Sequence, residues 1–177
     1  RPEELYLRLR MNVDLCEELG ASIYSFPMKY HPINDKEFFM NRDYIGKFWN
    51  RKFIRAVQAV LNSTKGKIGR GVDFFEEALD EFMKILWMPE TFIIYRRIYD
   101  ADLRFRLAGK YTTVTKHDCD LANEWWEKFS SLSMPKLEIA KSIIALNKFK
   151  STDINCNDSE ILDVLSYYTI TRDEAET

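Results

Sequence analysis

The chain has 177 residues, of which 46% are hydrophobic and 31% charged, and its formal net charge is -2. This length suits one domain with a real core, and the near-neutral charge gives no overall attraction to nucleic acid or to membrane surfaces. The sequence contains no apolar run long enough to span a bilayer and no recognisable signal peptide, so a membrane protein is not expected.

The cysteines predict the redox compartment of the protein, and the first residue bears on what precedes the chain. Cys16, Cys119 and Cys156 are odd in number and far apart, which predicts free thiols in a reducing compartment, the cytoplasm. The chain begins with Arg1 rather than methionine, so we expect a further N-terminal part to precede it.

The first element predicted is a helix over residues 2–19. Pro2 and the acidic residues after it are typical of a helix start, apolar residues recur at helical spacing, and Gly20 is a typical stop. Residues 21–33 (ASIYSFPMKYHPI) hold an uncharged apolar run at 23–28, which predicts a short strand limited by two prolines. Helix, glycine and strand form the closing half of a βαβ unit. A lone strand needs neighbours, so we expect self-association through it.

An aromatic-rich connector follows and ends near residue 48. The pattern of the remaining sequence predicts helices. Asp73 with Glu76 forms a capping-box pattern, Pro89 and Pro135 suit first helical turns, and Asn157 with Glu160 indicates a capped last helix. The helices are expected over 49–62, 73–88, 89–107, 121–132, 135–146 and from about 157 onward. The prediction is therefore a mainly α fold: about six helices in a domain over 36–177, preceded by one helix–strand unit over 1–35.

Residues 42–55 (RDYIGKFWNRKFIR) combine cations with aromatic rings. Such residues can neutralise phosphates and stack on bases, so a nucleic-acid or anion site would use Arg42, Lys47, Arg51, Lys52 and Arg55. The same pattern is typical of an amphipathic helix with a solvated basic face carrying Arg51, Lys52 and Arg55. We favour this second interpretation, and nucleic acid is not an expected partner.

Other motifs give no complete site. Residues 63–71 (STKGKIGRG) follow a helix and lack the Lys-Ser/Thr step of a P-loop. His117, Asp118 and Asp120 offer too few histidines for a metal-dependent phosphohydrolase, and helix capping explains them better. No cysteine or serine lies in a nucleophile motif. Of the adjacent pair Trp125 and Trp126, one is expected in the core.

Three stretches together resemble the C-terminal region of radical S-adenosylmethionine (radical SAM) proteins, some of which carry cobalamin-binding domains. They are SIYSFPMKYHPI, RDYIGKFWNRKFIRAVQAVLN with the following GVDFFEEA, and ILWMPETFIIYRR, so the resemblance covers about the first half of the chain. It implies that the helix–strand unit over 1–35 ends a parallel α/β barrel whose earlier strands lie upstream, and that 36–177 is a helical accessory domain packing on the barrel or capping its mouth.

The resemblance also implies which part of the protein binds the cofactors. The family binds a 4Fe-4S cluster through a CxxxCxxC motif, which this chain lacks, so the chain alone should be inactive and hold no cofactor or metal. The full-length protein would bind the cluster and S-adenosylmethionine, with Met28, Lys29 and Tyr30 at the cofactor because they follow the final barrel strand. The alternative is a stand-alone helical module that contacts nucleic acid or a protein through the basic-aromatic helix.

Overall fold

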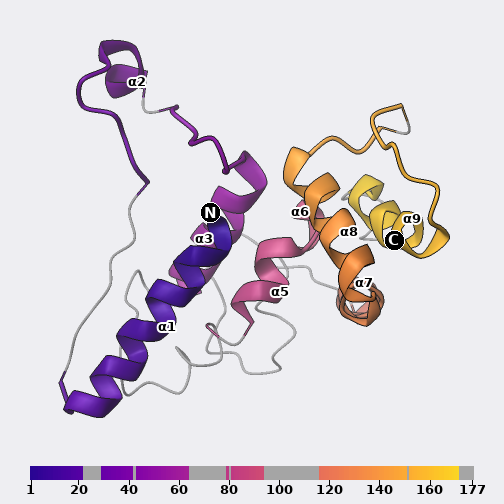
Figure 1. Cartoon of the computed structure of the whole chain (residues 1–177), viewed down its shortest axis with the longest axis horizontal. Coiled ribbons are helices and arrows are strands. Elements are labelled where there is room, and N and C mark those ends of the chain that lie inside the picture. Colours follow the sequence, from indigo (N-terminus) through magenta and orange to yellow (C-terminus); the bar gives the residue numbers. More distant parts are fainter. Residues whose placement is uncertain are drawn as a thin grey trace.

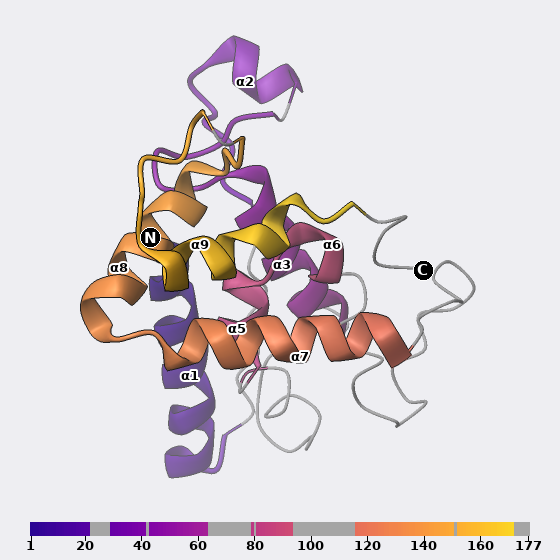
Figure 2. The same cartoon turned by 90° about the vertical axis from the view of Figure 1, so that its right-hand side faces the viewer.

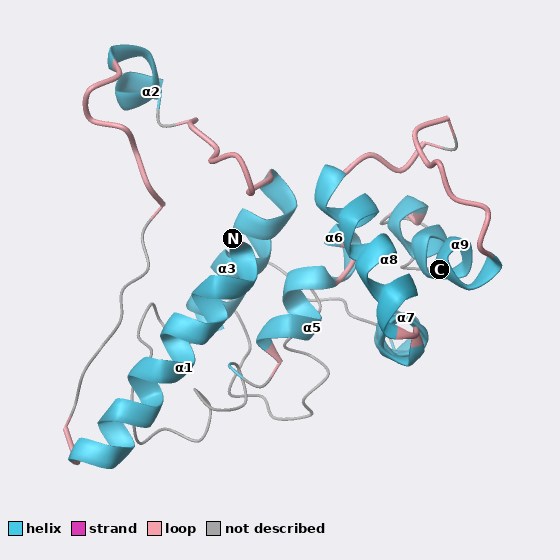
Figure 3. Cartoon of the chain, in the orientation of Figure 1, coloured by secondary structure: helices cyan, strands magenta, loops and turns pink. Residues whose placement is uncertain are grey.

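The computed structural model describes residues 1–21, 29–41, 43–63, 79, 81–93, 116–150 and 152–171. Every regular element in these ranges is a helix (Figure 3). The elements are α1 (Pro2–Leu19), α2 (Lys36–Asn41), α3 (Arg51–Ser63), α5 (Phe82–Trp87), α6 (Glu90–Ile93), α7 (Lys116–Ser131), α8 (Met134–Leu146), α9 (Ser159–Ser166) and a final 3-10 turn at Tyr167–Thr169. The prediction of a mainly α fold is confirmed.

The described helices form two groups joined by a short middle pair (Figure 1). Helices α1 and α3 lie on one side, α7, α8 and α9 on the other, and α5 with α6 lies between them. Helix α5 packs against both α1 and α3, and α9 packs against both α7 and α8. Helix α2 lies apart from the rest in both views (Figures 1 and 2).

Trp87 at the end of α5 connects the groups through the core. Its ring meets Phe53 of α3 edge-on at 5.3 Å and stacks against Phe129 of α7 at 6.4 Å. Its indole Nε1 donates to the Glu3 carboxylate of α1 at 3.2 Å. Aromatic pairs of this kind contribute stabilisation beyond that of the apolar area they bury. The Trp87 side chain therefore connects α1, α3, α5 and α7.

Local signals explain where several helices begin and end. Helix α1 has the predicted bounds, and Gly20 ends it with the left-handed φ of 60° that glycine adopts without strain. Helix α3 begins at Arg51, two residues later than expected, because Asn50 caps it by accepting from the Phe53 amide at 2.9 Å. Pro135 lies in the first turn of α8, as predicted.

The last helix is capped one residue later than the sequence suggested. Asp158, not Asn157, accepts from the amides of Glu160 and Ile161 at 3.0 and 3.2 Å. The pair Trp125 and Trp126 divides as predicted, with Trp125 in the core and Trp126 half-buried. The expected capping box at residues 73–76 lies outside the described residues.

The predicted helix–strand unit is wrong. No strand occurs among the described residues, and residues 29–33 at the end of the expected stretch form loop and turn. Residues 22–28 lie outside the described residues. Helix α1 does not stand apart as a barrel helix, because Leu9 and Val13 belong to the same core as the other helices. The division into 1–35 and 36–177 stays a prediction.

Candidate functional site

A cavity of about 550 Å³ lies between α1 and α3, and we call it the α1–α3 cavity. Its volume falls in the range of small-molecule sites. Three parts of the chain supply its walls: the N-terminal half of α1 with the residue before it, residues 29–30 with 44–49, and the outward face of α3. The lining residues are Arg1, Glu4, Leu5, Arg8, Lys29, Tyr30, Tyr44, Ile45, Gly46, Trp49, Ile54, Val57, Gln58 and Leu61.

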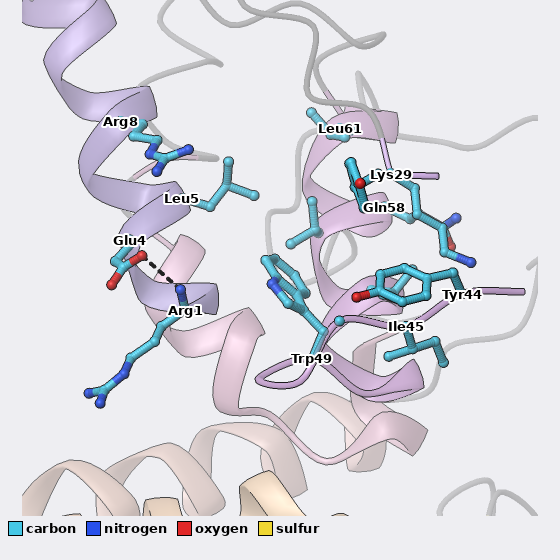
Figure 4. Close-up of a pocket in the computed structure, with 14 residues that line it drawn as sticks. Arg1, Glu4, Leu5, Arg8, Lys29, Tyr44, Ile45, Trp49, Gln58 and Leu61 are labelled. Carbon is cyan, nitrogen blue, oxygen red and sulfur yellow. Dashed lines mark hydrogen bonds and ion pairs between the residues drawn. The ribbon is translucent and has the colours of Figure 1, made fainter. Parts of the chain in front are cut away.

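Aromatic and aliphatic side chains form the inner wall of the cavity. Trp49 and Leu5 approach the centre from opposite sides, and Tyr44 closes the side opposite α1 (Figure 4). Tyr30 meets Tyr44 edge-on, with the ring centres 5.7 Å apart. A turn fixes Trp49, because its amide donates to the Gly46 carbonyl at 2.8 Å. The wall therefore offers flat apolar surfaces on which a planar group can stack.

Cations dominate the rim of the cavity. Among its described lining residues are the cations Arg1, Arg8 and Lys29 and one carboxylate, Glu4. The N-terminal amino group at Arg1 holds that carboxylate at 2.7 Å. Its hydrogen bond, followed by its charge, lowers the pKa of Glu4. With three cationic side chains against one carboxylate among the described lining residues, the net charge at the rim is positive and attracts anions.

Two of the three predicted cofactor residues lie in the described part of the chain. Lys29 and Tyr30 both line the α1–α3 cavity, whereas Met28 lies outside the described residues. The cavity brings them together with Arg8, Tyr44 and Trp49, which the sequence did not single out for this site. Only tertiary packing of α1 against the 44–49 segment makes these neighbours, so no local pattern marks them.

The basic-aromatic residues do not form one solvated surface. Arg42 lies outside the described residues, and the Lys47 ammonium lies 5.5 Å from the centre of the Phe48 ring. Arg51 is exposed, while Arg55 is paired with Glu90 of α6. The expected solvated position of Lys52 is wrong, because its side chain is 0% exposed. The arrangement gives little support to a phosphate-binding face on α3.

Lys52 is held in the core by two interactions. Its ammonium donates to the Leu86 carbonyl at 2.6 Å and lies 4.8 Å from the centre of the Phe53 ring. Burial lowers its pKa to about 7, against a smaller opposing effect of the Glu90 charge. The sequence carried a signal for this position, since Lys52 precedes the buried Ala56 and Val60 at i−4 and i−8.

The described residues contain no group of three His, Cys, Asp or Glu side chains that could hold a metal ion. Cys16 lies in the core on α1, and Cys156 lies in the loop before α9, so the thiols described do not fit a cluster site. Among the same residues, no helix is both long and apolar enough to cross a membrane.

Comparison with known proteins gives no relative for this chain: no family model, no curated protein and no solved structure matches it. The α1–α3 cavity is thus characterised by its residues alone. It combines stacking surfaces, a cationic rim and the hydrogen-bonding groups of Tyr44 and Gln58. It offers recognition of a planar, negatively charged group, and its described lining residues include no nucleophile with an adjacent general base.

Proposed function

We propose that this chain is a helical C-terminal accessory domain of a radical SAM enzyme. One observation carries the proposal. The two stretches that open the resemblance, 23–33 and 42–76, are separated in sequence, yet residues of both line the α1–α3 cavity. Lys29 and Tyr30 come from the first stretch, and Tyr44, Trp49 and Gln58 come from the second. In this proposal, the gathering of both resembling stretches at one surface is the reason to assign that surface a function.

In this proposal the cluster-binding barrel is a separate part of the protein, and the helical domain packs on it or caps its mouth. S-adenosylmethionine would supply the radical when it is cleaved reductively. Lys29 would hold an anionic group of the bound molecule, and Tyr30 would stack on its ring. A cytoplasmic location belongs to the same proposal, as does an inactive isolated chain.

The alternative, a nucleic-acid or protein-binding module that uses α3, has less support. Two of its five cations are occupied in the fold, because Lys52 is buried and Arg55 is paired with Glu90. A protein partner would need a different surface of the domain.

The test of the site uses Lys29→Ala and Tyr30→Ala in the full-length protein. We expect each variant to fold, to keep its iron, and to bind S-adenosylmethionine roughly tenfold more weakly, about the effect of losing one charged or stacking contact. Tyr30→Phe should retain most of the affinity because it keeps the ring.

Lys148→Ala is the matched control, since Lys148 is an exposed lysine outside the cavity. Parental affinity and cleavage in both Lys29→Ala and Tyr30→Ala would show that this segment is scaffold and would remove the site from the proposal.

A further inference from the structure

Two helix faces frame the α1–α3 cavity, and each offers a polar side chain to a ligand. The residues that follow helical spacing along these faces are Glu4, Leu5 and Arg8 of α1 and Ile54, Val57, Gln58 and Leu61 of α3. Figure 4 shows Arg8 on the α1 side of the cavity and Gln58 across from it. A ligand that fills the space between the helices therefore meets Arg8 at one side and Gln58 at the other.

The side chains of Arg8 and Gln58 are available for binding. Both are exposed, and among the described residues neither takes part in a hydrogen bond or an ion pair. Glu4, one turn before Arg8, is held instead by the N-terminal amino group at 2.7 Å. A guanidinium binds two oxygens of a phosphate at once, and a glutamine amide offers a donor and an acceptor side by side. Arg8 thus suits an anionic group, and Gln58 suits the edge of a heteroaromatic ring.

Trp49 supplies a stacking surface between these two groups. Trp87, Trp125 and Trp126 each pair with another aromatic ring, whereas among the described residues Trp49 pairs with none. The turn before it packs against the indole, because a Cβ added at Gly46 would lie 3.5 Å from Trp49 Cδ1. An indole that is supported in this way and lines a cavity is suited to stacking on a base.

We propose that the α1–α3 cavity binds a nucleoside monophosphate, with the base stacked on Trp49, the edge of the base at Gln58 and the phosphate at Arg8. A phosphate monoester carries a charge of about −1.5 to −2 at pH 7, which complements the net positive rim. The volume of about 550 Å³ suits one small molecule rather than a strand of nucleic acid. This inference rests on the proposed use of the cavity as a ligand site and adds the chemical class of the ligand.

Titration calorimetry of the 177-residue chain tests the ligand class. The probes are adenosine 5′-monophosphate, adenosine, ribose 5-phosphate and inorganic phosphate. We expect adenosine 5′-monophosphate to bind with a dissociation constant on the order of tens of micromolar. Each of the other probes lacks the base or the phosphate and should bind at least about tenfold more weakly. Equal affinity for adenosine 5′-monophosphate and ribose 5-phosphate would mean anion attraction without base recognition and would overturn the proposal, as would no binding of adenosine 5′-monophosphate at about 5 mM.

Substitutions at the cavity test the assigned contacts. Arg8→Gln should weaken binding of adenosine 5′-monophosphate at least about tenfold and leave that of adenosine unchanged, because only the phosphate contact is lost. Gln58→Leu should weaken both ligands by the same factor. Arg10→Gln is the matched control, since Arg10 lies on the same helix outside the cavity lining, and it should bind as the parent does. Parental affinity in Arg8→Gln would contradict the phosphate site.

Tryptophan fluorescence reports the stacking directly. Adenosine 5′-monophosphate should quench the emission of the parent, and Trp49→Phe should lose this quenching although the other three tryptophans remain. Quenching that persists in Trp49→Phe would contradict the assigned stacking. These outcomes are separate from those of the proposed function. Nucleotide binding by a protein whose full-length form holds no cluster would keep this site and remove the radical SAM assignment, and the reverse result would remove the nucleotide alone.

Discussion

At the scale of single residues, Lys52 is the least ordinary feature of the chain. A buried ammonium loses its hydration, and among the described residues the Leu86 carbonyl, the Phe53 ring and the charge of Glu90 partly compensate for that loss. The Leu86 carbonyl belongs to the last turn of α5, whose carbonyls lack partners within the helix. Lys52 therefore links α3 to the end of α5, at a position where its charged form is disfavoured.

This link predicts a pH dependence of stability. The pKa of Lys52 is about 7 in the folded chain against an ordinary 10.5, so between these values the unfolded chain binds more protons. The free energy of unfolding should therefore rise with pH from about 7 to about 10.5, by up to roughly 1 kcal/mol per pH unit from this residue. Lys52→Met should remove this contribution and flatten the profile.

The measurement is urea unfolding of both proteins at several pH values. Lys148→Met, a change at an exposed lysine, should keep the parental slope. Parallel profiles for the parent and Lys52→Met would mean that Lys52 does not titrate as described.

At the scale of elements, sequence signals located most helices but not their environment. Capping and proline patterns predicted α1 and α8 well, because those interactions are local. The prediction of a helix–strand unit was wrong because it relied on the apolar run at 23–28. An uncharged run with aromatic and β-branched residues resembles a buried strand in any context. The cavity residues Arg8 and Trp49 were missed since they become neighbours only through tertiary packing. Lys52 was misplaced because its charge was weighted above its helical register.

Helix α9 offers a test of one local signal. Asp158 caps it and also binds Lys136 of α8 at 2.9 Å. The hydrogen bond from Lys136, then that from the Ile161 amide, lowers the pKa of Asp158. Asp158→Ala should lower the thermal unfolding midpoint by a few degrees, because both the cap and the ion pair are lost. Asp158→Asn keeps a capping oxygen and should lose less.

The pH dependence of the Asp158→Asn effect checks the cause. A lowered carboxyl pKa stabilises the fold above the ordinary value of 3.8, and this stabilisation disappears as the pH falls through the lowered value. Calorimetry should therefore find the parent and Asp158→Asn different near neutral pH and equal in strong acid. A difference that persists in strong acid would assign the effect to something other than the carboxylate.

At the scale of the whole molecule, helix α1 contributes both to the core and to the candidate site. One side of it supplies the common core through Leu9 and Val13, and its N-terminal half borders the α1–α3 cavity. Four further apolar residues of α1, Leu7, Met11, Leu15 and Leu19, are exposed. A helix with apolar residues on opposite sides suits a position between two bodies.

The central claim is that the full-length protein is a radical SAM enzyme and that this domain belongs to it. The direct measurement is anaerobic reconstitution of the full-length protein with iron and sulfide, followed by reduction with S-adenosylmethionine present and quantification of 5′-deoxyadenosine. The proposal predicts a 4Fe-4S spectrum and 5′-deoxyadenosine from the full-length protein, and neither from the 177-residue chain. A full-length protein that binds no cluster and releases no 5′-deoxyadenosine would contradict it.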